Sequence, residues 1–437
     1  MQRKRLLPLK FRSKKVHIVL TNSACTLSVY GVARYRHFFR ANDWAIANSY
    51  SDADLILLHT CAYNQDQEDL AFKQILDIQR KKNPNSHLVV SGCMPKICKQ
   101  RLQNVFTGIS FGPRELTKLD DIINAKVSIS AIRNVELAKE DFSISFLYSL
   151  NKIIASIFLK PIVFGMHKYF NIKIEPYYKT LATLYDHRKF YIEACVGCLG
   201  KCAYCAIRFA RGRLKSAPIE KVVEEFRYGL QKGYKRFVLL GDDLGDYGRD
   251  INTDLVALLE EILKIEGDYE ILLYYLEPMG LGDYLHRLKP LFSTGKIIDV
   301  NIPVQTGSNR LSKLMNRHYD VEEIRAYVTE LRREFPILNV RAQMMVGFPG
   351  ETDEDFRKTV ELFDEFDEVG IFEYSDRPHT PASKMDDKVP EEIIKARAKK
   401  LRIKYLHNLY FRMPMRIKFV RKKYNLYQAK AVDQLID

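Results

Sequence analysis

Three cysteines close together carry the clearest chemical signal in the sequence. Cys198, Cys202 and Cys205 form a CxxxCxxC run directly after the strand-like stretch KFYIEAC, residues 189–195. Thiolates at this spacing bind three corners of a 4Fe-4S cube and leave its fourth iron open to another ligand. A structural zinc site is the alternative, but it needs a fourth ligand, which Cys195 would have to supply. The run therefore favours an iron-sulfur cluster with an open iron.

A second set of three cysteines is spread over the N-terminal part of the chain. Cys25, Cys61 and Cys93 fall at, or just after, the ends of the strand-like segments HIVLTNSAC, ADLILLHTC and LVVSGC. Their separations are 36 residues (61 − 25) and 32 residues (93 − 61). The carboxyl ends of parallel strands share one edge of an open α/β sheet, so we expect these cysteines to converge. Cys98 and Cys195 match neither set, and we interpret both as structural.

The elements around both sets follow a βα rhythm. Short apolar runs alternate with helical stretches early in the chain, which predicts a parallel-sheet α/β domain over residues 15–125. A longer alternation with six candidate strands predicts an incomplete (β/α)6 barrel over residues 187–401. The site of such a barrel is expected at the C-terminal ends of its strands.

The remaining segments are less regular. Residues 1–14 form a basic arm, residues 126–186 an apolar linker or insertion, and residues 402–437 a short basic tail. Within the linker, residues 144–166 are strongly apolar but interrupted by two lysines and a proline. A membrane span needs about 20 largely uninterrupted apolar residues. We therefore expect a packing helix and no stable membrane insertion, with membrane contact as an alternative.

Composition bounds the compartment and the partners. Eight cysteines in 437 residues are too few for a disulfide framework, and no long apolar run follows the basic opening MQRKRLLPLKFRSKK. We therefore expect a cytoplasmic protein. The net charge of +15 favours an anionic partner such as RNA, but the lysines are spread along the chain, so charge alone decides little.

With the cysteine loop at the top of an incomplete barrel, the sequence resembles the radical S-adenosylmethionine (SAM) superfamily. The segment IRFARGR, residues 207–213, resembles the stretch that follows this loop in the methylthiotransferase family. Four later segments are similar to successive signatures of that family: LLGDDLGDYG, IPVQTGSNRLSKLMNRHY, VGFPGETDEDFRKTVELF and EYSDRPHTPASKM. Cys25, Cys61 and Cys93 match the cysteines that hold its second 4Fe-4S cluster. The resemblance covers roughly residues 15–400.

This resemblance implies an enzyme with two [4Fe-4S] clusters and SAM as cofactors. SAM would bind the open iron of the cluster on the CxxxCxxC loop, and one electron from a reductant such as flavodoxin or ferredoxin would cleave it to a radical. The radical would take hydrogen from an unactivated C–H bond, the second cluster would present sulfur, and a second SAM would supply the methyl group. No catalytic side chain is assigned. Strand-end positions where SAM contacts are expected are Gly241, Asp242, Gln305, Gly347, Phe348 and Pro349.

Departures from the family bear on the substrate. Gln343 stands where an acidic residue is usual, and Asn301 stands where a histidine is usual. The family's C-terminal β-barrel domain does not fit in the 36 residues after Leu401 (437 − 401). We therefore favour methylthiolation of a peptide or protein side chain, with tRNA adenosine as the alternative. A cobalamin-dependent radical SAM enzyme and a non-catalytic iron-sulfur or zinc scaffold are further alternatives.

Overall fold

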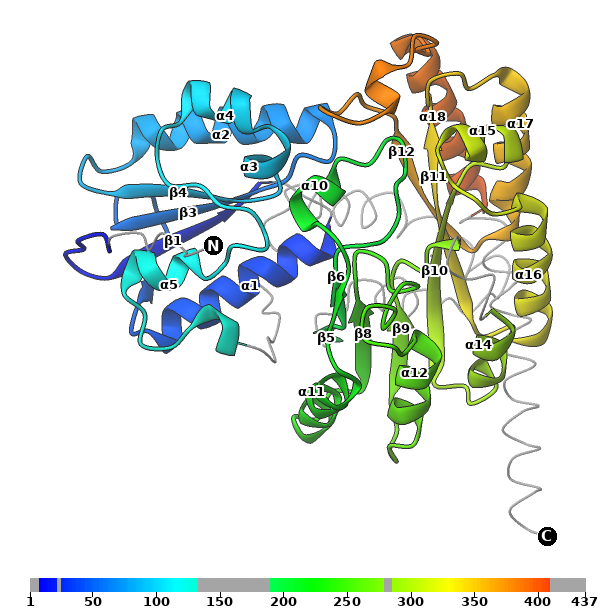
Figure 1. Cartoon of the computed structure of the whole chain (residues 1–437), viewed down its shortest axis with the longest axis horizontal. Helices are drawn as coiled ribbons and strands as arrows, with labels where there is room; N and C mark the ends of the chain where they lie inside the picture. Colours follow the sequence, from blue (N-terminus) through cyan, green and yellow to red (C-terminus); the bar gives the residue numbers. More distant parts are fainter. Residues whose placement is uncertain (1–7, 22–24, 133–188, 279–284, 409–437) are drawn as a thin grey trace, which may run out of the picture.

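The computed structural model of the chain holds two α/β units in sequence order (Figure 1). Among the residues that it describes, no helix has both the length and the apolar character needed to cross a membrane. The apolar segment 144–166, expected to be a packing helix, and the tail beyond residue 408 lie outside the described residues. The described residues are 8–21, 25–132, 189–278 and 285–408.

The N-terminal unit is a four-stranded parallel sheet with the strand order β2-β1-β3-β4. Every residue of the central strand β3 is buried, as its apolar run LILLHT predicts for a strand covered on both faces. Alternate residues of β3 enter two different cores, one on each face of the sheet. The strands are β1 (Lys15–Leu20), β2 (Ala45–Ile46), β3 (Leu55–Thr60) and β4 (His87–Gly92). The helices are α1 (Thr26–Ala41), α2 (Gln65–Lys81), α3 (Met94–Ile97), α4 (Lys99–Val105) and α5 (Lys118–Ile123).

The second unit is a six-stranded parallel sheet in the order β12-β11-β10-β9-β8-β5, which confirms the predicted incomplete barrel. Its strands are β5 (Lys189–Glu193), β8 (Arg236–Leu240), β9 (Glu270–Leu273), β10 (Ile297–Gln305), β11 (Asn339–Val346) and β12 (Glu368–Glu373). Helices between the strands cover the outer face: α11 (Ile219–Gln231), α12 (Leu255–Leu263), α14 (Leu285–Phe292), α15 (Asn309–Leu314), α16 (Val321–Glu334), α17 (Asp353–Leu362) and α18 (Glu391–His407).

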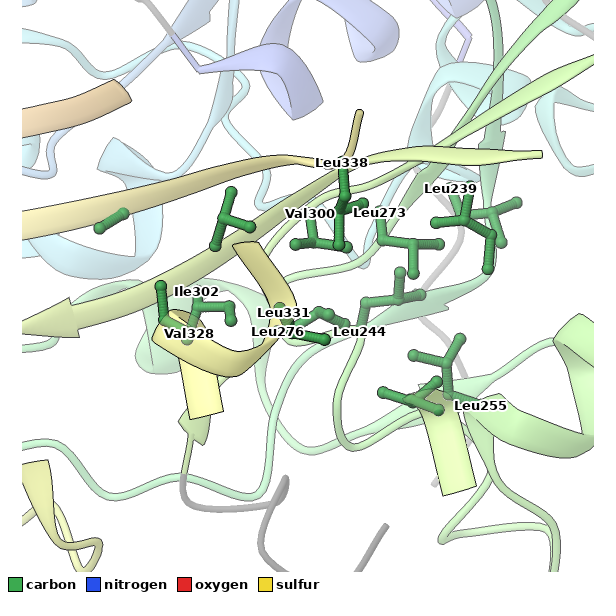
Figure 2. Packing of buried hydrophobic residues seen from close by; sticks show 14 of the residues in the cluster. Leu239, Leu244, Leu255, Leu273, Leu276, Val300, Ile302, Val328, Leu331 and Leu338 are labelled. Carbon is green, nitrogen blue, oxygen red and sulfur yellow. The ribbon is translucent and has the colours of Figure 1, made fainter. Parts of the chain in front are cut away.

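Alternation along the strands separates an apolar outer face from an inner face. Figure 2 shows Leu239, Leu273, Val300 and Ile302 of three neighbouring strands in one buried cluster with Val328 of α16. Because successive side chains of a strand point to opposite faces, the residues between these positions line the inner face. The large core therefore lies between the sheet and its helices, and the inner face is left for other contacts.

Helix α1 of the N-terminal unit covers part of this inner face. Leu27, Tyr30 and Ala33 of α1 pack in one cluster with Tyr191 of β5 and Val238 of β8. In Figure 1 the two units lie side by side, with α1 reaching toward β5 and β6 (Cys195–Val196). The N-terminal unit thus covers the inner face of the barrel at β5, the strand at one edge of the sheet.

A buried ion pair fixes the other side of the junction. Arg377, in the loop after β12, pairs with Glu68 of α2, and their side chains are only 1% and 5% exposed. Glu68 also accepts hydrogen bonds from the Cys98 thiol at 2.8 Å and from Arg101 at 2.6 Å. Although burial alone would raise the pKa of Glu68, these hydrogen bonds hold it below its usual value. These contacts hold α2, the helix that follows Cys61, against the loop after β12, the last strand of the barrel.

We expect Arg377→Met to lower the stability of the protein by about 3 kcal/mol, because removing one partner leaves a buried carboxylate with less compensation. The denaturant midpoint of the cluster-free protein measures this loss. The matched control is Arg402→Met, which removes an exposed pair with Glu373 and should cost less than about 1 kcal/mol. Equal midpoint shifts in the two variants would show that the buried pair contributes nothing special to the junction.

Candidate iron-sulfur site

The loop that carries Cys198, Cys202 and Cys205 lies between β6 and the short helix α10 (Ile207–Arg211). Four hydrogen bonds from later parts of the barrel hold its backbone. The Gly197 amide donates to Asp242 Oδ2 at 2.7 Å, and the Leu199 amide donates to Asp246 Oδ2 at 2.9 Å. In the turn that follows α15, Asn316 Nδ2 donates to the Lys201 carbonyl at 2.8 Å, and the Met315 carbonyl accepts from the Ala203 amide at 2.9 Å. The barrel therefore fixes this loop, and Arg114 of the N-terminal unit adds a hydrogen bond to the Val196 carbonyl at 3.2 Å.

The three thiols of this loop are half-buried and close to one another. Burial raises the pKa of Cys202 to about 11 and raises the pKa values of Cys198 and Cys205 as well. The charge of Cys205 adds to the rise at both other cysteines, which places the three thiols in one electrostatic group. Buried thiolates of this kind need a positive centre such as cluster iron, so the donor set fits a cube held by three thiolates.

The geometry lends no support to a compact zinc site. In the described part of the chain, no group of three or more His, Cys, Asp or Glu side chains is spaced to hold a single metal ion. A single ion draws all its ligands to one centre, whereas a 4Fe-4S cube binds each thiolate through a different iron. Cys195, the possible fourth zinc ligand, is buried, and its thiol contacts the Asp243 carbonyl at 3.3 Å.

Arg317 is a site residue that the sequence reasoning missed. Its side chain is fully buried and donates to Tyr204 Oη at 2.9 Å and to Glu277 Oε2 at 2.8 Å. One of its nitrogens lies 3.7 Å from Cys202 Sγ. Burial raises the pKa of Cys202, and the positive charge of Arg317 opposes that rise. Arg317 lies in the segment LMNRHY, which is part of a family signature, so this signature is the sequence feature that could have identified it.

Two of the predicted SAM-contacting residues, Gly241 and Asp242, contact the segment that leads into the cysteine loop. Asp242 binds the Gly197 amide, and its other oxygen lies 3.4 Å from Arg211. Gly241 faces Cys195, because a Cβ atom at residue 241 would stand 2.5 Å from the Cys195 sulfur. The absence of a side chain at Gly241 is therefore explained by packing against Cys195. Asp242 has an observed role in holding the loop, and its contact with SAM stays a prediction.

The other four predicted positions follow β10 and β11. Gln305 is buried and adopts a left-handed φ of 65° at the end of β10. Gly347 has a φ of 81°, a left-handed conformation in which the backbone of any residue with a side chain would be strained. Phe348 is buried with its ring centroid 6.4 Å from that of Tyr204, and buried Pro349 follows it. These residues lie at strand ends as expected, and their contacts with SAM stay predictions.

The N-terminal cysteines converge at the carboxyl edge of their sheet. Cys25 precedes α1, Cys61 follows β3, and Cys93 follows β4 at the start of α3. Burial raises the pKa of Cys93, and the charges of Cys61 and Cys25 add to the rise. The three cysteines are far apart in the sequence, but they lie close enough in space for their charges to interact. Convergence was the geometric expectation, whereas their role as cluster ligands stays a prediction.

The turn before Cys93 requires a glycine. Gly92 has a φ of 97°, and a Cβ atom at this position would stand 2.1 Å from the Thr60 carbonyl oxygen. That same carbonyl accepts a hydrogen bond from the Cys93 amide at 3.0 Å. The close approach of the two strand ends therefore sets the positions of Cys61 and Cys93 relative to each other.

A polar row lies on the inner face of the barrel. Asn301, Arg341 and Glu368 are register partners on β10, β11 and β12. Arg341 Nε donates to Asp299 Oδ1 at 2.8 Å, and burial raises the pKa of Glu368 to about 7. Asn301 is 7% exposed, and its side-chain oxygen has no hydrogen-bond partner in the structure. A buried acceptor without a partner is costly, so this row is suited to a ligand that donates a hydrogen bond.

Comparison with known proteins matches both units. Residues 192–363 match the model of the Radical SAM superfamily, and residues 17–111 match the model described as Uncharacterized protein family UPF0004. The chain is 32% identical over 359 residues to ribosomal protein uS12 methylthiotransferase RimO of Chlamydia pneumoniae, covering 80% of this chain and 69% of that protein. It is 30% identical over 365 residues to threonylcarbamoyladenosine tRNA methylthiotransferase MtaB of Thermotoga maritima, covering 81% of this chain and 75% of that protein.

A solved structure shows the same fold at low identity. The radical S-adenosylmethionine methyltransferase TsrM from Kitasatospora setae, with cobalamin and a [4Fe-4S] cluster bound, matches with a TM-score of 0.54 and 15% identity. The match covers 85% of this chain and 77% of that chain. At this identity the likeness concerns the arrangement of an α/β unit before a radical SAM barrel.

Proposed function

Because the chain belongs to the radical SAM methylthiotransferase family, we propose that it inserts a methylthio group at an unactivated C–H bond of a peptide or protein side chain. Membership of the family implies an enzyme that uses SAM and two [4Fe-4S] clusters. The observation that carries the proposal is the pair of cysteine triads, each gathered at the carboxyl edge of its own parallel sheet. Cys198, Cys202 and Cys205 would hold one cluster, and Cys25, Cys61 and Cys93 the other.

When bound, the clusters and SAM supply the reductive cleavage, the hydrogen abstraction and the transferred sulfur, while the protein positions and shields the reacting groups. Asp242 and Asp246 hold the backbone of the barrel loop at its cysteines. Arg317 places a buried positive charge beside Cys202. Helix α1 covers the inner face near β5, which keeps water from that side of the barrel. A reductant such as flavodoxin or ferredoxin would supply the electron that cleaves SAM, and the protein would act in the cytoplasm.

The chemistry of the inner face supports a peptide as the substrate. Asn301 and Gln343 place neutral amides on the inner face, and four largely buried arginines of the chain are each paired with a carboxylate. These arginines are Arg211, Arg317, Arg341 and Arg377. An RNA-binding site needs cations that are available to phosphates, whereas neutral amides complement a polypeptide. The tRNA alternative is retained because several relatives are tRNA methylthiotransferases.

Mass spectrometry of cells with and without the gene tests the substrate. We expect a peptide or protein that carries a methylthio group in the parent strain and loses it in the deletion strain. Complementation with the Cys198→Ala variant should fail to restore the modification, while complementation with Cys98→Ala should restore it. Loss of a methylthio-adenosine from tRNA in the deletion strain would contradict the peptide proposal and establish the alternative. A corrinoid spectrum after purification with cobalamin would instead point to the cobalamin-dependent class.

A further inference from the structure

We propose that Asn301 is a specificity-determining residue whose side-chain oxygen accepts a hydrogen bond from a backbone N–H group of the peptide substrate. Since this role takes the substrate to be a peptide, it rests on the proposed function and adds to it a residue that recognises the chain. Three features of the inner face carry it: a buried acceptor without a partner, neighbouring polar groups that are paired with one another, and an open side next to them.

Asn301 lies in the middle of β10 with its side chain on the inner face. Val300 and Ile302, its neighbours along the strand, belong to the outer core that Figure 2 shows, so Asn301 points the other way. Its carbonyl accepts a hydrogen bond from the Leu276 amide at 2.8 Å, which fixes the backbone here. The side chain is only 7% exposed, and no described residue donates to its oxygen. Because an unpaired buried acceptor lowers stability, its presence points to a ligand that completes the bond.

The polar groups beside Asn301 are already paired with one another. Arg341, its register partner on β11, donates from Nε to Asp299 Oδ1 at 2.8 Å. Asn339 Nδ2 donates to the other oxygen of Asp299 at 2.8 Å. The guanidinium of Arg341 also lies over the ring of Tyr274, 4.4 Å from its centroid. These donors are engaged with other groups, and the oxygen of Asn301 is the acceptor that is left over.

The charges of this row favour a neutral donor. Arg341 and Asp299 form an ion pair whose side chains are 14% and 6% exposed, so their charges cancel. Glu368, the register partner of Arg341 on β12, has its pKa raised to about 7 by burial and is partly protonated at neutral pH. A phosphate would find Arg341 already paired, and an ammonium group would lie beside its positive charge. The N–H group of a peptide bond is neutral and meets neither penalty.

The β11 and β12 side of the inner face is accessible to a polypeptide. Helix α1 packs on β5, β8 and β9, on the other side of the sheet's inner face. Along β11 the residues that point inward are partly exposed, whereas those that alternate with them are buried. Gly370 of β12, the register partner of Gln343, is exposed and has no side chain to cover the Gln343 amide. A polypeptide that lies along this side can bring a backbone N–H group to Asn301.

The first measurement compares two asparagines of the same wall. Asn301→Leu replaces an unpaired acceptor by an apolar side chain of similar size, so the denaturant midpoint of the substrate-free protein should stay the same or rise. The matched control is Asn339→Leu, which removes a hydrogen bond to the buried Asp299 and should lower the midpoint. If Asn301→Leu lowers the midpoint as much as Asn339→Leu does, or does not fold, Asn301 holds the fold and the proposal is overturned.

The second measurement follows recognition of the substrate. The reconstituted full chain is incubated with dithionite, SAM deuterated at its methyl group, and a desalted extract of the deletion strain, which contains the unmodified substrate. Mass spectrometry gives the labelled methylthio product, and chromatography gives 5'-deoxyadenosine from the same reaction. The ratio of product to 5'-deoxyadenosine should fall about tenfold in Asn301→Leu, the effect of one hydrogen bond left unmade. Asn339→Leu should keep the parent ratio.

The outcomes separate the role of Asn301 from the function on which it rests. If the parent labels tRNA, or labels nothing, the proposed function is wrong, and the role of Asn301 toward a peptide falls with it. If the parent labels a peptide or protein and Asn301→Leu gives the parent ratio, the function survives and the role of Asn301 is wrong. If product and 5'-deoxyadenosine fall together, Asn301 acts on SAM and not on the substrate, which also overturns the proposal.

Discussion

The Cys198→Ala, Cys202→Ala, Cys205→Ala variant is expected to bind half of the iron of the parent and to cleave no SAM. Anaerobic reconstitution of the parent should give about eight iron and eight labile sulfide per chain, because each cube contains four of each. The triple variant should retain about four of each, held by the N-terminal triad, while formation of 5'-deoxyadenosine under dithionite falls to background. Iron analysis and chromatography of the SAM products measure the two effects.

Two other cysteines of the chain serve as controls for this experiment. Cys98 contacts Glu68 at the junction of the units, and Cys195 packs against Gly241 and the Asp243 carbonyl. Replacing either by alanine should leave the full iron content, although the cavity costs some stability. Full retention of iron in the triple variant would contradict the assignment of the barrel triad, and loss of iron in Cys195→Ala would revive a four-ligand site.

The sequence was sufficient for those features that depend on local pattern. The buried runs before Cys61 and Cys93 predicted strands, and because parallel strands end at one edge, they predicted that these cysteines meet. The six βα units of the barrel were also predicted. The strand boundaries were less accurate for a physical reason. The apolar run YEILLYYLE, residues 269–277, predicts one of the six strands over its whole length, but β9 ends at Leu273, because Tyr275 adopts a left-handed φ of 65° that interrupts the extended backbone.

Features that depend on contacts between distant residues were not predictable in this way. Arg377 and Glu68 are 309 residues apart in the sequence, and no periodic pattern connects them. Gly241 was expected to contact SAM, which stays a prediction, and the structure adds a contact that the sequence did not indicate, with Cys195 of a different segment. The contact of α10 with the N-terminal unit also depends on docking. In each case the residue type was visible in the sequence, but the partner that gives it a role comes from tertiary packing.

The variant with Cys25, Cys61 and Cys93 replaced by alanine is expected to separate the two halves of the reaction. It should still cleave SAM to 5'-deoxyadenosine under dithionite, while the methylthiolated product falls below detection. The structural reason is that four hydrogen bonds from Asp242, Asp246, Met315 and Asn316, all within the barrel, hold the barrel loop, and that the N-terminal unit contributes to it through Arg114. None of these contacts uses an N-terminal cysteine.

The measurement compares SAM cleavage with product formation in the same reaction, so that a general loss of protein lowers both and a specific loss lowers one. Cys98→Ala is the matched control in the N-terminal unit and should keep both activities, because Cys98 lies in the Glu68 group and not among the three converging thiols. A variant that keeps its thermal midpoint but loses SAM cleavage would show that the two sites depend on each other for the first step. Helix α10 would then be the first element to investigate, because it follows the barrel's cysteine loop and its Ala210 packs in one buried cluster with Cys93 of the N-terminal unit.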